Sequence, residues 1–215
     1  MVTEREICTI LDILNESKRN TMLEEYKDLP AFQLLIMTLL SARTKDATVI
    51  PIALKLFETH PTPEKILELN EAELAQRIKR IGFHNAKARH ILQLCHKLLE
   101  EFNGEVPNTL EELTSLPGVG RKTANCILSY VFNIPAIAVD IHVHRITNTN
   151  RLGWINTKTP EQSEKALEKI VPKERWNDIN AVIVDHGQRI CAPMKPKCHL
   201  CSIQKYCKYP INSEN

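Results

Sequence analysis

The feature that most restricts the fold is a pair of glycines one residue apart in residues 116–125, which read Leu-Pro-Gly-Val-Gly-Arg-Lys-Thr-Ala-Asn. Glycine at these positions allows a tight backbone turn that a larger residue would hinder. We expect a helix to begin directly after the second glycine, so that its first amide groups can bind an anion. The segment therefore predicts two helices joined by a hairpin that can hold a phosphate. A plain turn with a solvated Arg121–Lys122 pair is the alternative.

A lysine and an aspartate near this hairpin form a candidate catalytic pair. Lys122 falls in the first turn of the expected helix, where the helix dipole disfavours positive charge. Asp140 follows eighteen residues later, in a loop that we expect to enter a helix near its N-terminus. A partly deprotonated amine can attack a sugar carbon, and a carboxylate can stabilise a cationic sugar and transfer protons. Helix capping alone is the alternative role for Asp140.

A second cluster of functional residues lies near the C-terminus, where four cysteines follow the spacing C-x6-C-x2-C-x5-C. Residues 1–18 do not resemble a signal peptide, and no run of eighteen apolar residues occurs. We therefore expect an intracellular protein, in which clustered cysteines bind metal more often than they form disulfides. An iron–sulfur cube needs four thiolates, whereas zinc favours paired C-x2-C knuckles, of which one is present. The pattern favours a [4Fe–4S] cluster, with zinc as the alternative, on Cys191, Cys198, Cys201 and Cys207. The other three cysteines are expected to be buried core thiols: Cys8, Cys95 and Cys126.

Together, the hairpin, the lysine, the aspartate and the cysteine spacing resemble the endonuclease III family of DNA-repair glycosylases. The resemblance covers nearly the whole chain. It extends to the segments Leu39–Ala42 with Thr44–Asp46, Ile81–Ala88 and Asn103–Pro107.

The resemblance implies an all-α fold, a helix-hairpin-helix DNA glycosylase fold with two helical domains and a DNA-binding cleft between them. Residues 24–134 would form a helical barrel domain with the helix-hairpin-helix motif at about 111–130. Residues 1–23 and 135–215 would form the iron–sulfur cluster domain, with the cluster loop at 191–207. Apolar residues at the helical period agree with helices, as in Phe32, Leu35, Ile36, Leu39 and Leu40. Helix start signals are expected at Asn70, Asn108 and Thr159.

The resemblance also implies an activity and its site. The protein would remove oxidised pyrimidines from duplex DNA and cleave the abasic site by β-elimination, with Lys122 as the Schiff-base nucleophile and Asp140 as the essential acid. Its cofactor would be a [4Fe–4S] cluster. Its partner would be double-stranded DNA containing damaged bases or abasic sites. We expect a monomer with no membrane association, in the cytoplasm or nucleoid, or in the nucleus or an organelle of a eukaryote.

Further residues are candidate DNA contacts. They comprise four hairpin residues, two lysines of the cysteine loop, the family's wedge position and three further polar residues. In that order they are Gly118, Val119, Gly120 and Arg121; Lys195 and Lys197; Phe83; and Ser41, Arg43 and His142. Phe83 matches the apolar wedge that fills the gap left by a flipped base, or is a plain core aromatic. His142 would orient Asp140, bind phosphate, or simply pack on the surface. Residues 186–208 carry five lysines and arginines and no acid, which suits phosphate binding or a solvated basic tail.

The sequence departs from the family at Arg43. The family's best-known members carry glutamine at this position. Because arginine donates more firmly to guanine acceptors, we expect an altered preference for the base opposite the lesion. An ion pair with Asp46 is the alternative.

Two other classes of function remain open. A monofunctional glycosylase of the same superfamily, of mismatch or adenine type, normally lacks a lysine at the position of Lys122. Its adenine-removing branch carries a further C-terminal domain, whereas this sequence ends eight residues after Cys207. A non-enzymatic DNA-binding iron–sulfur protein would use the hairpin and the cluster, but it gives no reason for Lys122 and Asp140 to occur together.

Overall fold

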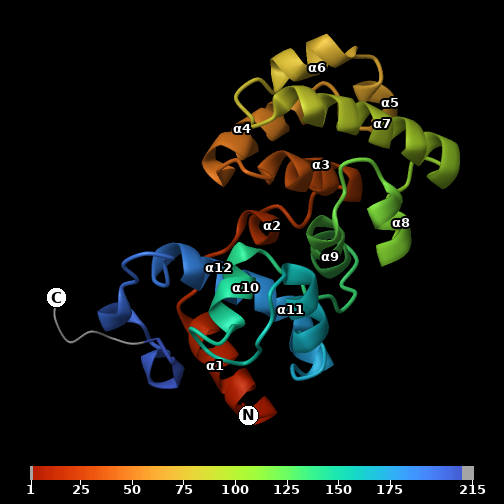
Figure 1. The fold of residues 1–215 in the computed structure, drawn as a ribbon. Coiled ribbons are helices and arrows are strands. Elements are labelled where there is room, and N and C mark those ends of the chain that lie inside the picture. Colours follow the sequence, from red (N-terminus) through yellow and green to blue (C-terminus); the bar gives the residue numbers. More distant parts are fainter. Residues whose placement is uncertain (1, 210–215) are drawn as a thin grey trace. The chain divides into compact units, whose positions relative to one another are not determined.

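The computed structural model describes residues 2–209, which are mostly helical (Figure 1). No strand occurs within those residues, and the one isolated bridge joins Asn148 and Ile155. The prediction of an all-α fold is therefore confirmed. No helix in the same range is long and apolar enough to cross a membrane.

The chain divides into two compact units. One is continuous, Met22–Phe132, and the other combines Met1–Thr21 with Asn133–Asn215. The continuous unit contains α2 (Met22–Glu25), α3 (Ala31–Ser41), α4 (Asp46–Phe57), α5 (Pro63–Ile66), α6 (Glu71–Arg77), α7 (His84–Phe102), α8 (Leu110–Ser115) and α9 (Arg121–Tyr130). The discontinuous unit contains α1 (Glu4–Glu16), α10 (Ile141–Thr147), α11 (Pro160–Leu167), α12 (Trp176–Arg189) and the single-turn 3₁₀ helices η1 (Lys173–Arg175), η2 (Cys198–Leu200) and η3 (Gln204–Tyr206).

Helix α3 lies at the centre of the continuous unit and contacts α4, α7 and α9. Its apolar residues are buried all around, which is the pattern of a helix enclosed by others. The longer α7 buries one face against α5 and α6. The aliphatic residues of this unit thus pack its helices around α3.

Two of the three expected helix starts are where the sequence places them. Asn70 and Glu73 form a full capping box at α6, and the Thr159 hydroxyl accepts from the Gln162 amide at α11. The start expected at Asn108 is wrong by one residue, because Thr109 caps α8 by accepting from the Glu112 amide. Thr109 is a good cap itself, and the local pattern does not separate two adjacent candidates.

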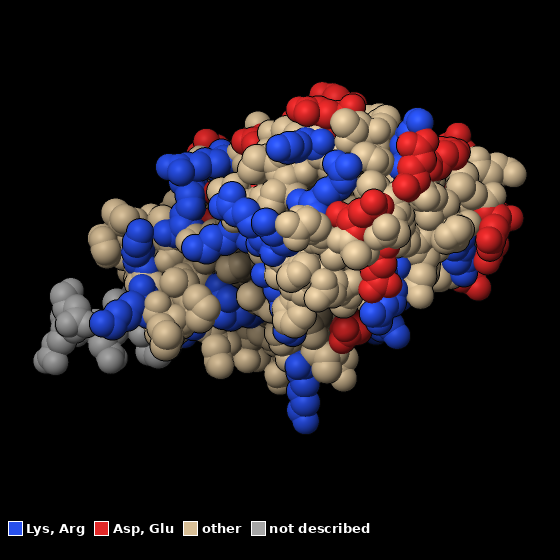
Figure 2. Space-filling view, turned by 90° about the horizontal axis from the view of Figure 1, so that it is seen from above, with Lys and Arg blue, Asp and Glu red and all other residues tan. Residues whose placement is uncertain are grey.

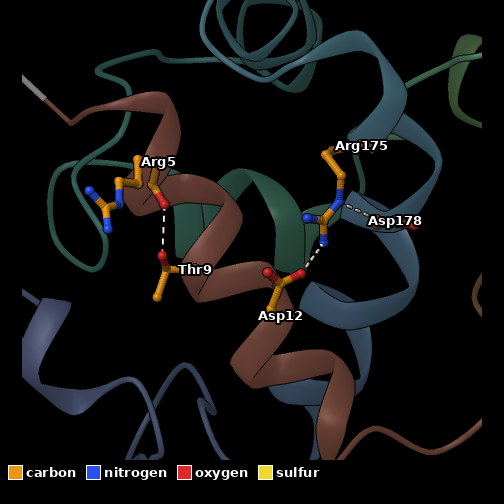
Figure 3. Close-up of polar contacts among 5 residues, drawn as sticks. All are labelled: Arg5, Thr9, Asp12, Arg175 and Asp178. Carbon is orange, nitrogen blue, oxygen red and sulfur yellow. Dashed lines mark hydrogen bonds and ion pairs between the residues drawn. The ribbon is translucent and has the colours of Figure 1, made fainter.

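The discontinuous unit is built around α1, α10 and α12. Its core includes Ile7 and Leu11 of α1, Val143 of α10 and Ile183 of α12. On the surface, Arg175 bridges Asp12 of α1 and Asp178 of α12, at 2.8 and 2.6 Å (Figure 3). The N-terminal helix is thereby held to a segment more than 150 residues away in the sequence.

The three cysteines outside the C-terminal group differ from one another. Cys95 and Cys126 are buried core thiols, as expected. Cys8 is only partly buried, so its assignment to the core is wrong. It lies on α1 beside the buried Ile7, at the edge of the apolar face, where the helical period alone does not fix burial.

Candidate active site and cysteine site

The hairpin joins α8 to α9, and its two glycines have different roles. Gly118 has φ +80°, and a Cβ there would lie 3.0 Å from the Cβ of His90. Any other residue would therefore be strained and crowded. Gly120 has φ −89°, and a Cβ there would meet nothing within 4 Å. The expectation that both glycines are needed for the turn thus holds for Gly118 only, while Gly120 leaves open space in front of α9.

Helix α9 begins at Arg121, directly after the second glycine, as expected. The Val119 side chain is only 6 % exposed, and its amide donates to the Leu116 carbonyl at 3.1 Å. Val119 therefore anchors the hairpin, and its side chain is not accessible to a ligand. Arg121 and Lys122 are half-buried in the first turn, where free amides favour an anion.

Lys122 lies close enough to Asp46 to influence its carboxyl group. Burial raises the pKa of Asp46, and the positive charge of Lys122 opposes that increase. The environment of this lysine thus contains an acid that sequence reasoning did not assign to it.

Asp140 is the N-cap of α10, the position that the sequence predicts. Its Oδ1 accepts two bonds, from the amides of His142 and Val143, each at 2.8 Å. The other carboxylate oxygen accepts no hydrogen bond from any residue in the range 2–209. Capping therefore fixes the carboxylate and leaves one oxygen available.

The ring of His142 packs against α12. A Cβ on Gly187 would lie 2.6 Å from His142 Nδ1, and Arg145 Nη2 lies 3.3 Å from the same nitrogen. Burial lowers the pKa of His142, with Asp140 opposing and Arg145 reinforcing that change. Its hydrogen bond to Asp140 comes from the backbone amide, so the packed-histidine interpretation fits the ring.

The four C-terminal cysteines line one cavity together with His186 and Arg151. His186 Nε2 lies 3.8 Å from the sulfur of Cys201, and the Tyr209 amide donates to the sulfur of Cys207 at 3.5 Å. Burial raises the pKa of the Cys201 and Cys207 thiols, and the neighbouring cysteines raise it further. Such a group of thiols is stabilised when a metal replaces the protons.

Zinc and an iron–sulfur cube need different arrangements of the four sulfurs. A zinc ion with bonds of about 2.3 Å would need sulfurs about 3.8 Å apart. A cube places each sulfur on a different iron and so separates them more widely. The four sulfurs line one cavity, and no three His, Cys, Asp or Glu side chains within residues 2–209 form a single-ion site. The cysteines therefore supply the four thiolates that a cube requires.

Two arginines place positive charge beside the cysteine cavity. Arg151 is 6 % exposed, lines the cavity and lies 3.7 Å from the centre of the Tyr209 ring. Arg145 Nη2 donates to the Cys191 carbonyl at 2.7 Å. Four thiolates on an oxidised cube leave it net negative, so one buried and one partly buried cation suit that group. The sequence analysis missed both, because arginine near a cysteine motif has no distinctive spacing.

Arg43 and Phe83 contact each other on the surface. The guanidinium of Arg43 lies 5.4 Å from the centre of the Phe83 ring, a cation–π distance. Phe83 is 63 % exposed, which excludes the core-aromatic interpretation. Both residues have positive φ, +56° and +59°. Arg43 makes no ion pair with Asp46 in the described part of the chain, so that alternative is wrong.

Lys87 supports the loop that carries Arg43. Its Nζ donates to the carbonyls of Leu40 and Ala42 at 2.8 and 2.7 Å, at the C-terminal end of α3. Burial lowers the pKa of Lys87 to about 8. Ser41, a candidate DNA contact, donates its hydroxyl to the Thr38 carbonyl at 2.8 Å instead. Sequence reasoning missed Lys87, although an alanine-flanked lysine early in a helix is a weak signal for a buried role.

The loop between the first two cysteines is exposed. Lys195 has φ +52°, and the Lys197 amide donates to the Ile190 carbonyl at 2.9 Å. Between Cys191 and Lys195, Met194 is 85 % exposed. The two lysine side chains are therefore accessible to a polyanion.

Comparisons with known proteins agree on one family. The model of the HhH-GPD superfamily of base excision DNA repair proteins matches residues 36–173. An endonuclease III of Thermotoga maritima is 44 % identical over 184 residues, which are 86 % of this chain and 85 % of the relative.

Two solved structures have the same fold. A trapped endonuclease III–DNA covalent intermediate, an estranged-adenine complex, has a TM-score of 0.84 and 37 % identity, covering 97 % of both chains. A thermostable thymine-DNA glycosylase has a TM-score of 0.81 and 31 % identity, covering 94 % of both chains.

Proposed function

Because the chain belongs to the endonuclease III family within the HhH-GPD superfamily of base excision DNA repair proteins, we propose that it removes oxidised pyrimidines from duplex DNA and cleaves the abasic site. Members of this family are DNA glycosylases with abasic-site lyase activity. The observation that carries the proposal is the position of Lys122 in the first turn of α9. It lies two residues after Gly120, where an added Cβ would meet no atom within 4 Å. The related protein trapped as a covalent DNA intermediate supports covalent chemistry.

In this proposal Lys122 is the nucleophile. Its amine attacks C1′ of the damaged nucleotide, and the bond to the base breaks as the base leaves with a proton. The bond between C1′ and the ring oxygen then breaks, the oxygen takes up a proton and stays on C4′ as a hydroxyl, and an imine joins Nζ to C1′. The 2′ proton becomes acidic, and its removal expels the 3′ phosphate. The amine must lose a proton before it attacks, and the neighbouring Asp46 carboxylate, whose pKa burial raises, is its acceptor in this proposal.

Asp140 stabilises the cationic sugar in this proposal. Its Oδ1 is fixed by the two α10 amides, so the charge is held in a defined orientation. The oxygen that accepts no hydrogen bond within residues 2–209 would face the sugar and transfer protons.

The [4Fe–4S] cluster belongs to the same proposal as a structural group. Cys191, Cys198, Cys201 and Cys207 would hold it, and their shared cavity and the adjacent Arg151 support this assignment. When bound, the cluster would fix the loop of Lys195 and Lys197 for contact with phosphates and would take no part in bond cleavage.

The DNA contacts follow from the surfaces described above. The backbone of the hairpin residues Gly118–Gly120, with Arg121, would hold phosphate at the start of α9. Phe83 would enter the gap left by the flipped base, and Arg43, stacked on its ring, would read the base opposite the lesion. The protein would act on DNA as a monomer.

A mismatch glycosylase is the second candidate, because a thymine-DNA glycosylase is 31 % identical over most of the chain. The two candidates differ in substrate and in covalent chemistry. A thymine or uracil mismatch would be the preferred substrate of the second, and it would not need imine formation.

Borohydride trapping tests the leading proposal. We expect reduction of the cluster-loaded protein with a duplex containing one oxidised pyrimidine or one abasic site to give a covalent protein–DNA adduct. The Lys122→Ala variant should give none, while Lys65→Ala, at an exposed position of α5, should trap like the wild type. Asp140→Asn keeps a capping oxygen but loses the charge, and we expect about 10²–10⁴-fold slower trapping.

Absence of an adduct from folded, cluster-loaded wild type would contradict the lyase mechanism. Base release from a thymine mismatch without an adduct would instead favour the second candidate.

A further inference from the structure

A groove between α4 and α6 presents three cations around an apolar floor. Lys55 of α4 lines one side, and Arg77 and Arg80, at and beyond the end of α6, line the other. Gln76 adds an amide to the rim, and Ile52 contributes to the floor. No acidic residue lines this groove. The groove thus combines donors and positive charge in a concave surface.

The three cations have no protein partner in the described part of the chain. None of them forms a hydrogen bond or an ion pair with any residue from 2 to 209. Arg89, on the next helix, differs, since it pairs with Glu71 at 3.1 Å. The three cations of the groove are therefore available to an anionic ligand.

The capping of α6 explains why Arg77 lacks an internal partner. Glu73 lies four residues before Arg77, the spacing at which a helical ion pair forms. The Glu73 carboxylate instead accepts the Asn70 amide at 2.9 Å, in the capping box. The acid that could neutralise Arg77 is therefore turned to the start of the helix, and the groove keeps its charge.

The groove adjoins the loops that carry Arg43 and Phe83. Helix α4 begins three residues after Arg43, and Arg80 precedes Phe83 by three residues. The two loops are joined by a hydrogen bond from the Gly82 amide to the Thr44 hydroxyl, at 3.0 Å. At 1.5 Å per residue, Lys55 lies about 14 Å along α4 from its start. That length spans roughly four nucleotides of one strand of a duplex.

Figure 2 shows groups of Lys and Arg side chains on the face that is seen, with Asp and Glu side chains among and beside them. Arginine binds phosphate through a fork of parallel donors, and lysine binds it as a point charge. A row of phosphates matches three separated cations better than one small anion does.

We propose that the groove of Lys55, Arg77 and Arg80 binds the sugar-phosphate backbone of the DNA that flanks the lesion, roughly four nucleotides beyond the Arg43–Phe83 pair. This proposal rests on the proposed function, because it extends the DNA contact of the same unit. It assigns a substrate requirement, namely a duplex long enough to reach the groove.

Salt-dependent binding tests the groove. The triple variant Lys55→Ala, Arg77→Ala, Arg80→Ala is compared with a control that removes the same charge from α11 and the residues on either side of it: Lys158→Ala, Lys165→Ala, Lys169→Ala. The probes are duplexes with a non-cleavable tetrahydrofuran abasic analogue and flanks of two or ten base pairs on each side, and an undamaged long duplex. Affinity is measured from about 50 to 200 mM salt.

On the long duplex, the slope of log K against log salt should be about 2.7 smaller in magnitude for the groove variant than for the wild type. Each of the three lost phosphate contacts accounts for about 0.9 of this difference. Over a fourfold rise in salt, the wild type would then lose about 40-fold more affinity than the variant. The control should keep the wild-type slope. On the short duplex the groove variant and the control should agree. Arg77→Lys with Arg80→Lys should retain most of the slope.

Equal slopes for the groove variant and the control on the long duplex would overturn the proposal, and so would an equal loss on both duplex lengths. The two proposals can fail separately. If borohydride trapping fails while the salt slope on undamaged duplex still depends on the groove residues, the lyase function is contradicted and the groove proposal is retained.

Discussion

The hairpin of α8 and α9 and the cysteine loop of residues 191–207 both present cations to solvent, but they are held in different ways. The hairpin lies between regular helices, with Val119 buried and Gly118 against His90. The cysteine loop contains two single-turn 3₁₀ helices and an exposed Met194, around a cavity lined by thiols. The first surface is fixed by the packing of the chain itself. We expect the second to depend on what fills the cavity.

Removal of one cysteine should produce the largest difference between the two surfaces. In Cys201→Ser we expect loss of the cluster absorbance and of hydrogen-exchange protection in α10, α12 and the cysteine loop, at a cost of several kcal/mol. Protection in α8 and α9 should be retained. Cys8→Ser, which changes a half-buried thiol outside the cavity, is the control. Equal loss of protection in α8 and α9 would show that the hairpin also depends on the cavity.

The two hairpin glycines allow a sharper test of the packing-based surface. Gly118→Ala should destabilise the protein by about 2 kcal/mol, because alanine is strained at positive φ and its Cβ meets His90. Gly120→Ala should cost less than about 1 kcal/mol, since its Cβ meets nothing within 4 Å, yet it should weaken DNA binding by filling the space before α9. Urea denaturation and duplex binding measure the two effects. A Gly120→Ala variant that is unstable but binds DNA normally would reverse this assignment.

A smaller effect on stability is expected at Lys87, whose amine donates to two carbonyls at the C-terminal end of α3. Lys87→Met should cost about 1 kcal/mol, because two carbonyls lose a donor. Burial lowers the folded-state pKa to about 8, below the unfolded value of 10.5. Between these values the unfolded state binds more protons, so wild-type stability should rise with pH in that window relative to the methionine variant. Below pH 8 the difference between the two proteins should be constant. Urea denaturation at pH 7, 9 and 10 measures the free energy of unfolding of both proteins. A difference between them that does not change with pH would contradict the lowered pKa of Lys87.

Much of the fold follows from sequence patterns that act locally. The aliphatic period of α3, the capping box at Asn70 and the start of α9 after Gly120 each depend on residues within one or two helical turns. The position of Asp140 as an N-cap is local in the same sense. These features could be predicted because the physics that produces them is contained in a short window.

Long-range contacts could not be predicted in the same way. The contact of Arg43 with Phe83 joins residues forty positions apart, and each residue alone suggested another role. The influence of Lys122 on Asp46, and the hydrogen bonds from Lys87 to α3, also join separate helices. The periodicity of one helix gives its buried face but not the partner that meets it. The environment of the candidate lysine was therefore the least predictable part of the site.

The discontinuous unit has a consequence for the order in which the protein is completed during synthesis. Helix α1 emerges first, yet its core partners in α10 and α12 emerge more than 120 residues later. Residues 22–132 can fold as soon as they leave the ribosome, since that unit is continuous. Throughout that interval the apolar face of α1, with Ile7, Ile10, Leu11 and Leu14, has no partner. The hairpin unit can therefore be complete before the four C-terminal cysteines are synthesised, whereas the first helix to emerge is buried only after α10 and α12 have followed.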